Sequence, residues 1–187
     1  MRITGGRASG IPIKAPKGDI TRPATDRMRE AIFSSLGNRV EGSRVVDLFA
    51  GTGAYGLEAI SRGAVRATFY ESNRNALACL KQNQQAVLKS CKLSSDIVRI
   101  VTGDVYSVGT ISEKADLIFI DPPYDTIEER IEDIFQQAEK HADKDAYVIL
   151  ELPGNLEPEP AGWQLIRRFG KSKRDAPGAA VFERRIV

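Results

Sequence analysis

The chain has 187 residues, of which 42% are hydrophobic and 28% charged, and its formal net charge is +2. These proportions are those of an ordinary soluble globular protein of one domain, and no apolar run is long enough to cross a bilayer. The N-terminus lacks the apolar stretch of a signal peptide, and Cys79 and Cys91 lack the spacing of metal ligands. We therefore expect a cytoplasmic protein with reduced thiols and no bound metal.

The charged residues are unevenly distributed along the chain. Residues 1–40 hold eight Lys and Arg against three Asp and Glu, and residues 160–187 hold seven against two. The stretch between them, 41–159, holds twelve against twenty. Basic ends around an acidic middle suggest that both termini contact a polyanion, and solvated surface charge is the alternative.

Residues 1–24 predict a small N-terminal hairpin or extension of the single domain. Two short segments, 2–4 and 11–14, flank a glycine-rich turn, and the Pro- and Gly-containing stretch that follows predicts irregular structure. Thr25 is expected to cap the first helix. The apolar residues of this helix recur at helical spacing: Met28, Ala31, Ile32 and Leu36.

Strands and helices then alternate. Apolar runs predict strands over 44–49, 67–71, 97–102, 116–120 and 146–152, and helical patterns predict helices over 55–62, 75–88 and 127–141. This alternation predicts a parallel sheet with helices on both faces. Segments 163–169 and 180–186 predict two more strands, joined by a loop too short for a crossover, and therefore an antiparallel hairpin. The whole is similar to the seven-strand, mostly parallel, Rossmann-like sheet of class I methyltransferases.

A glycine loop follows the first of these strands. The segment 51–56 reads Gly-Thr-Gly-Ala-Tyr-Gly and matches the dinucleotide fingerprint G-x-G-x-x-G, with Gly51 and Gly53 allowing a ligand to approach the backbone. Glu71 ends the next strand, about where the fingerprint expects an acid for a ribose. Taken alone, this region fits NAD.

Two further acids favour a different cofactor. Asp47 lies four residues before Gly51, where it would crowd a pyrophosphate but suit a cationic ligand, and Asp104 follows the third strand, where it could accept a hydrogen bond from an adenine amino group. S-Adenosylmethionine carries an ammonium and a sulfonium group and no phosphate. We therefore predict S-adenosylmethionine, with Asp47, Gly51, Gly53, Glu71 and Asp104 as its binding residues; for each acid, capping of a loop is the alternative.

The segment Asp121-Pro122-Pro123-Tyr124 directly follows the apolar strand over 116–120. In open α/β sheets, ligands bind at this end of the strands. Asp121 and the Pro122 carbonyl can accept hydrogen bonds from an exocyclic amine, the two prolines fix the backbone, and Tyr124 offers a face on which a base can stack. These four residues are therefore predicted to be catalytic; a strand that ends in a proline turn, with Tyr124 partly buried, is the alternative. Glu151, near the end of the strand over 146–152, is interpreted only as part of the termination of that strand.

With these motifs assembled, nearly the whole chain resembles the bacterial 16S ribosomal RNA guanine-N2 methyltransferases. The resemblance rests on the N-terminal segment 1–6, on 22–30, on the glycine loop with 56–59 and 61–64, and on 121–124. The glycine loop and the tetrapeptide specify only an amino-methyltransferase, whereas 22–30 supports the RNA substrate. Ala54 and Tyr55 depart from the smaller or aliphatic residues expected there.

The resemblance implies methyl transfer from S-adenosylmethionine to the N2 amine of a guanine in 16S rRNA, within the small subunit or an assembly intermediate. A monomer is expected, with RNA contacts from basic residues near both ends: Arg7, Arg22, Arg27, Arg29, Lys171, Lys173 and Arg174. Arg27 and Arg29 cannot face the same way on one helix, so one of them could be structural. The alternatives are an adenine-N6 DNA methyltransferase, a non-catalytic nucleic-acid-binding protein on the same scaffold and, more distantly, a nicotinamide oxidoreductase.

Overall fold

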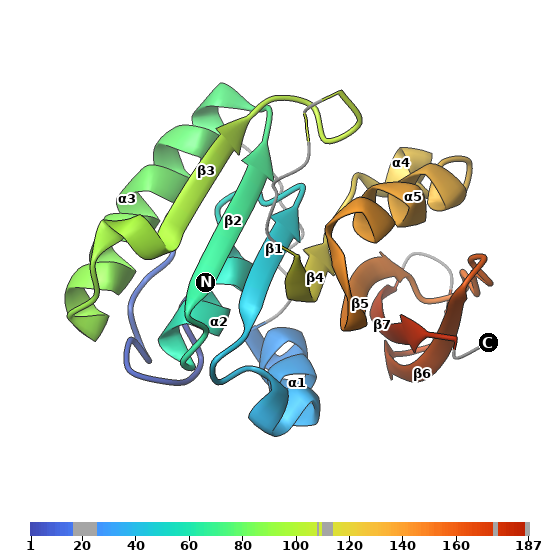
Figure 1. The fold of residues 1–187 in the computed structure, drawn as a ribbon, viewed down its shortest axis with the longest axis horizontal. Coiled ribbons are helices and arrows are strands. Elements are labelled where there is room, and N and C mark those ends of the chain that lie inside the picture. The colour runs from blue at the N-terminus through green and yellow to red at the C-terminus, as the bar shows by residue number, and fades with distance from the viewer. Residues whose placement is uncertain (17–25, 108, 110–113, 174–175, 186–187) are drawn as a thin grey trace.

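The computed structural model describes residues 1–16, 26–107, 109, 114–173 and 176–185. They form one seven-stranded sheet with the strand order β3-β2-β1-β4-β5-β7-β6 (Figure 1). The strands are β1 (Arg44–Leu48), β2 (Arg66–Glu71), β3 (Val98–Thr102), β4 (Ala115–Ile120), β5 (Ala142–Pro153), β6 (Trp163–Gly170) and β7 (Pro177–Arg184). The helices are α1 (Asp26–Leu36), α2 (Ala54–Ser61), α3 (Arg74–Cys91), α4 (Tyr124–Ile127) and α5 (Ile131–His141), with short 3-10 turns at Gly37–Arg39 and Ser95–Ile97.

The sheet changes direction at its C-terminal end. Strands β1 to β5 pair in parallel, whereas β7 runs antiparallel to both β5 and β6. The predicted α/β class and the antiparallel C-terminal hairpin are therefore confirmed. The strand order reverses between β1 and β4, which places a topological switch point at the carboxyl ends of these two strands, where open α/β sheets bind ligands.

Two apolar cores lie on opposite faces of the sheet. Successive residues of β4 alternate between them: Phe119 packs in the core that includes α1, α2 and α3, and Ile120 in the core that includes α5. This alternation follows from the two-residue period of a strand. Burial on both faces explains why the central strands read as continuous apolar runs in the sequence.

The structure corrects the predicted helix over 127–141, which is two helices. Pro123, with φ of −56°, is the N-cap of α4, so helix formation begins at Tyr124. A second helix then begins at Ile131, with Glu132 and Asp133 in its first turn, where acidic side chains are favoured. Within the described parts of the chain, no helix is long and apolar enough to cross a membrane.

The N-terminal segment over residues 1–13 folds back on itself through one isolated bridge. Arg2 and Pro12 make an antiparallel bridge, the Ile3 amide donates to the Ile11 carbonyl at 2.9 Å, and the Gly10 amide donates to the Ile3 carbonyl at 2.8 Å. The irregular stretch predicted up to residue 24, and the predicted cap Thr25, fall largely outside the described residues.

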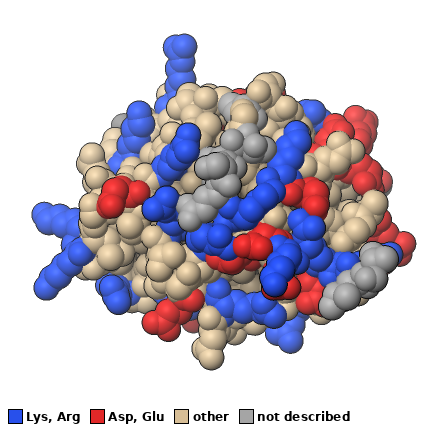
Figure 2. Space-filling model, viewed as in Figure 1, with Lys and Arg blue, Asp and Glu red and all other residues tan. Residues whose placement is uncertain are grey.

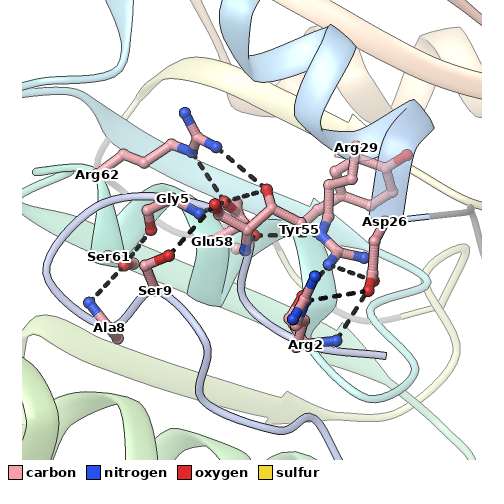
Figure 3. Close-up of polar contacts among 12 residues, drawn as sticks. Arg2, Gly5, Ala8, Ser9, Asp26, Arg29, Tyr55, Glu58, Ser61 and Arg62 are labelled. Atoms are coloured by element: carbon pink, nitrogen blue, oxygen red, sulfur yellow. Dashed lines mark hydrogen bonds and ion pairs between the residues drawn. The ribbon is translucent and has the colours of Figure 1, made fainter.

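Glu58 of α2 anchors this hairpin to the domain (Figure 3). Its buried carboxylate accepts hydrogen bonds at 2.8 Å from the Thr4 and Gly5 amides and from the Thr4 hydroxyl. It also pairs with the guanidinium groups of Arg29 at 3.3 Å and Arg62 at 2.8 Å. The first residues of the chain are therefore held by a fully satisfied buried acid.

Candidate active site

A cavity of about 670 Å³ opens at the carboxyl edge of the parallel strands. Its lining comes from the ends of β2 and β5 and from the segments that follow β1, β2, β3 and β4, so it lies at the switch point of the sheet. Most of the predicted catalytic and cofactor-binding residues line it: Gly51, Glu71, Asp104, Asp121, Pro122, Pro123 and Tyr124. The fold thus gathers side chains that are up to 73 residues apart in the sequence.

The glycine loop has the backbone that its sequence predicts. Gly51 and Gly53 have φ values of 54° and 81°, in the left-handed region that favours glycine. A Cβ atom on Gly53 would lie 2.3 Å from Leu80 Cδ1, so this glycine also allows α2 and α3 to pack closely. Phe49, just before the loop, adopts φ of 60° without being a glycine, a strained conformation of the kind that concentrates at functional sites.

Glu71 ties the loop to the next strand. Its Oε2 accepts the Gly51 amide at 2.6 Å, and its Oε1 accepts the Ser72 and Asn73 amides at 2.9 and 2.7 Å. The carboxylate also lines the cavity. Glu71 is thus fixed in orientation by the backbone while it faces the space where a ligand would lie.

Asp47 has a different position from the one predicted. The structure buries its side chain beneath the loop, outside the cavity lining, where Oδ2 accepts the Gly56 amide at 2.9 Å. Burial raises the pKa of Asp47 well above its ordinary value, and the hydrogen bond from Gly56 partly opposes this shift. The geometry corrects the prediction of direct ligand contact, because the Asp47 carboxylate accepts an amide in the first turn of α2 and does not line the cavity.

Aromatic and polar side chains enclose the side of the cavity after β3. Asp104, exposed toward solvent, lines the cavity and accepts the Tyr106 amide through Oδ1 at 3.1 Å. Tyr106 packs edge-on against Phe49 at 5.7 Å between ring centroids, and the Arg130 guanidinium lies 3.5 Å above the Tyr106 ring. Of these residues, Phe49 and Asp104 line the cavity, so a flat, partly apolar group with a polar edge could contact the Phe49 ring and the Asp104 carboxylate there.

Asp121 lies at the opposite side of the cavity, directly after β4. Its amide donates to the Leu48 carbonyl at 3.4 Å, which joins the ends of β1 and β4. The side chain is exposed to the cavity but otherwise enclosed by protein, and this loss of bulk water raises the pKa of Asp121 to about 7. The carboxyl group therefore changes its charge near neutral pH.

Glu151, which the sequence reading took only as the end of a strand, lines the same cavity. It is buried, and its Oε1 accepts a hydrogen bond from the Tyr55 hydroxyl. An acid at the end of the strand next to β4 was the signal available in the sequence. It was missed because the order of neighbouring strands is not visible in a single sequence.

The predicted RNA-binding residues fall into three groups. Arg29 is completely buried and pairs with Glu58 and Asp26, so the prediction that it contacts RNA is wrong and it is the structural member of α1. Arg22 and Arg174 lie outside the described residues. The remaining four are exposed: Arg7, Arg27, Lys171 and Lys173.

Three of these exposed residues belong to neighbouring segments. A Cβ atom on Gly170 would lie 3.3 Å from Met28 Cε, so the loop after β6 lies against the start of α1, next to Arg27. The same loop packs on Gly154, just beyond β5, and therefore lies at the carboxyl edge of the sheet. Arg7 is separate, because its amide donates at 2.7 Å to the carbonyl of Ser61, at the far end of α2.

The charges are also segregated on the molecular surface. Figure 2 shows Lys and Arg side chains across the middle of one face, whereas many Asp and Glu side chains gather at the edge where Figure 1 places α4 and α5. Basic and acidic side chains are therefore unevenly distributed over this face of the molecule.

Comparison with known proteins identifies the family. The model of the family described as "Conserved hypothetical protein 95" matches residues 1–175. The chain belongs to this family. It is 30% identical over 192 residues to "Putative rRNA methyltransferase YlbH" of Bacillus subtilis, covering 99% of this chain and 100% of that protein.

Two further relatives agree with this assignment. "Ribosomal RNA small subunit methyltransferase D" of Escherichia coli is 32% identical over 172 residues, covering 89% of this chain and 83% of that protein. The solved structure "Putative methyltransferase yhhF from Escherichia coli" has a TM-score of 0.75 and 29% identity, covering 98% of this chain and 97% of that one. The predicted family and the class I methyltransferase fold are thereby confirmed.

Proposed function

We propose that this protein transfers a methyl group from S-adenosylmethionine to the exocyclic N2 amine of a guanine in 16S rRNA of the small ribosomal subunit. The observation that carries the proposal is that Asp121-Pro122-Pro123-Tyr124 lines one cavity together with Gly51, Glu71 and Asp104. Membership of a methyltransferase family supports the reaction. The names of the relatives support the small-subunit RNA, and the resemblance noted in the sequence supports guanine N2.

The cavity suits S-adenosylmethionine, which supplies an electrophilic methyl group bound to a sulfonium. Glu71 would accept hydrogen bonds from the ribose hydroxyls, and Asp104 would accept one from the adenine amino group, beside the Phe49 ring. Gly51 leaves the backbone open for close approach. The volume of about 670 Å³ is within the range of small-molecule sites.

The tetrapeptide would hold the acceptor amine. The lone pair of guanine N2 is delocalised into the ring, so the nitrogen is a weak nucleophile. Hydrogen bonds from its two N–H groups to the Asp121 carboxylate and the Pro122 carbonyl favour a tetrahedral nitrogen and direct the lone pair at the methyl group. The Asp121 charge then stabilises the cationic nitrogen and receives its proton.

The target base must leave its stack to reach this cavity. Tyr124 would replace the lost stacking, a contribution on the order of 1–3 kcal/mol. Arg27, Lys171 and Lys173 lie on adjoining segments at the cavity edge of the sheet and would contact phosphates near the flipped base. Arg7, with the rest of the N-terminal extension over residues 1–24, would contact RNA farther from the cavity.

Methyl transfer to ribosomal subunits tests this proposal. Small subunits lacking native modifications would be incubated with the protein and methyl-labelled S-adenosylmethionine, and the RNA would then be digested to nucleosides. We expect label in N2-methylguanosine. Label in N6-methyladenine of a DNA control, with none in RNA, would replace the proposal by DNA methylation. Cofactor binding without transfer to either would show that the acceptor is wrong.

A further inference from the structure

Glu151 and Asp121 occupy neighbouring positions at the carboxyl edge of the sheet. Strands β4 and β5 are parallel, and Ile120 pairs with Leu150. The next residues along the two strands are Asp121 and Glu151, which therefore lie side by side, with their side chains on the same face. Both line the cavity.

The Tyr55 side chain fixes Glu151 in this place. Its ring stacks on Phe119 of β4, with 5.2 Å between centroids and 18° between planes, and lies 6.4 Å from the Phe33 ring of α1. The Tyr55 ring therefore packs against both β4 and α1, and its hydroxyl donates a hydrogen bond to Glu151 Oε1. Tyr55, which departs from the residue type expected in the family, thus forms a hydrogen bond with an acid that lines the cavity.

The ionisable groups around Glu151 are mostly acids. Asp121 faces it from β4, Asp47 lies on β1, and Tyr55 reaches it from α2, whereas its partner on β7 is the uncharged Ala179. Arg29 of α1 is the cation on this side, and its ion pairs go to Glu58 and Asp26. Within the described part of the chain, neither Asp121 nor Glu151 forms a salt bridge.

Two enclosed carboxyl groups that form no salt bridge do not both ionise readily. Burial raises the pKa of Glu151 well above its ordinary value, and the charge of Asp121 raises it further, against smaller opposing effects of the Tyr55 hydrogen bond and Arg29. Asp121, which is open to the cavity, is the member of the pair that loses its proton first.

We propose that Glu151 is a positioning residue of the methyl-transfer site: held by the Tyr55 hydroxyl, it stays neutral beside Asp121 and leaves Asp121 as the one charged acceptor of the substrate amine. This role rests on the proposed function. In the transfer, the nitrogen forms the new bond to the methyl carbon, and sulfur keeps the electron pair of the bond that breaks. The nitrogen then releases its proton to the Asp121 carboxylate, which passes it to solvent.

Titration of the carboxyl groups by carbon-13 NMR tests the pairing in the protein without RNA or cofactor. In the wild type, we expect Glu151 to remain protonated through neutral pH. In Asp121→Asn, its midpoint should fall by about one pH unit or more, because the neighbouring charge is gone. Glu157→Gln, at an exposed acid outside the cavity, is the control and should leave the midpoint unchanged. An ordinary midpoint for Glu151 in the wild type would overturn the pairing.

Kinetics of the variants distinguish the positioning role proposed for Glu151 from the role of the Asp121 charge in accepting the amine. We expect Glu151→Gln and Tyr55→Phe each to lower kcat about tenfold with unchanged cofactor affinity, against about a thousandfold for Asp121→Asn. A loss in Glu151→Gln as large as that in Asp121→Asn would overturn the positioning role. Circular dichroism would verify that each variant folds.

The two proposals fail in different ways. If the nucleosides contain no N2-methylguanosine, the proposed function fails, whereas the titration of Glu151 still reports whether the two carboxyls are coupled. If the carboxyls titrate independently while N2-methylguanosine forms, only the role given to Glu151 is wrong.

Discussion

Two buried glutamates of this protein have opposite surroundings. Glu58 and Glu151 are exposed by 0% and 4% respectively. Glu58 receives hydrogen bonds from the backbone and the Thr4 hydroxyl and pairs with two guanidinium groups (Figure 3). Glu151 accepts one hydrogen bond, from the Tyr55 hydroxyl, and lies beside other acids. With similar burial, Glu58 is therefore an ion-paired acid, whereas Glu151 is an acid whose pKa is raised.

Helix α2 connects the two regions. Tyr55 and Glu58 are three residues apart and so lie on neighbouring positions of one helix face. Tyr55 points to the cavity acids and Glu58 to the N-terminal hairpin. The surrounding charges, rather than burial alone, therefore distinguish the ion-paired Glu58 from Glu151, for which we propose a role in the methyl-transfer site.

The largest effect on stability is expected for Glu58→Ala. Removing this carboxylate leaves the buried Arg29 without its one fully buried carboxylate partner, and breaking a buried ion pair in this way costs about 3–5 kcal/mol. Urea unfolding measures the loss. Glu30→Ala, at an exposed acid of α1, is the matched control and should change the unfolding free energy by less than about 0.5 kcal/mol. Equal losses of unfolding free energy in Glu58→Ala and Glu30→Ala would mean that the ion pairs of Glu58 do not stabilise the fold.

The pH dependence of kcat/KM tests the raised pKa of Asp121 in the cavity. The pKa of Asp121 is raised to about 7, so the carboxylate that accepts the amine becomes scarce as the pH falls below that value. We expect kcat/KM, which reports the free enzyme, to fall about tenfold per pH unit below pH 7 and to level off above it. A profile that stays flat down to pH 5 would mean that Asp121 keeps an ordinary pKa.

The smallest effect is expected for the basic loop. The double substitution Lys171→Ala and Lys173→Ala should weaken RNA binding and reduce the slope of log affinity against log salt by about 0.7–0.9 per lost phosphate contact. The value of kcat at saturating RNA should not change. Lys144→Ala provides the control, because this exposed lysine lies near the start of β5, at the opposite edge of the sheet. An unchanged slope in the double variant would place the RNA elsewhere.

Local patterns predicted the fold and one wall of the cavity. Strand periodicity, the glycine loop and Asp121-Pro122-Pro123-Tyr124 each occupy a few consecutive residues, so their positions relative to the strand ends can be read directly. The carboxyl ends of parallel strands meet at one edge, and this is why Glu71, Asp104 and Asp121, each near the end of a strand, line one cavity.

Burial and long-range pairing could not be read in the same way. Arg29 looks like any basic residue of an amphipathic helix, and its partner Glu58 is 29 residues away. The hydrogen bond between Tyr55 and Glu151 spans 96 residues and depends on β5 lying next to β4. Asp47 precedes the glycine loop as expected, but its side chain turns to the Gly56 amide, away from the cavity.

The most direct test of the account is methyl transfer by Asp121→Asn, with cofactor affinity measured on the same preparation. Asparagine keeps the shape of the side chain and removes its charge. The account predicts that the variant binds S-adenosylmethionine within about threefold of the wild type and loses about a thousandfold in transfer to small subunits. Turnover like that of the wild type would contradict the assignment of Asp121 as the acceptor of the substrate amine.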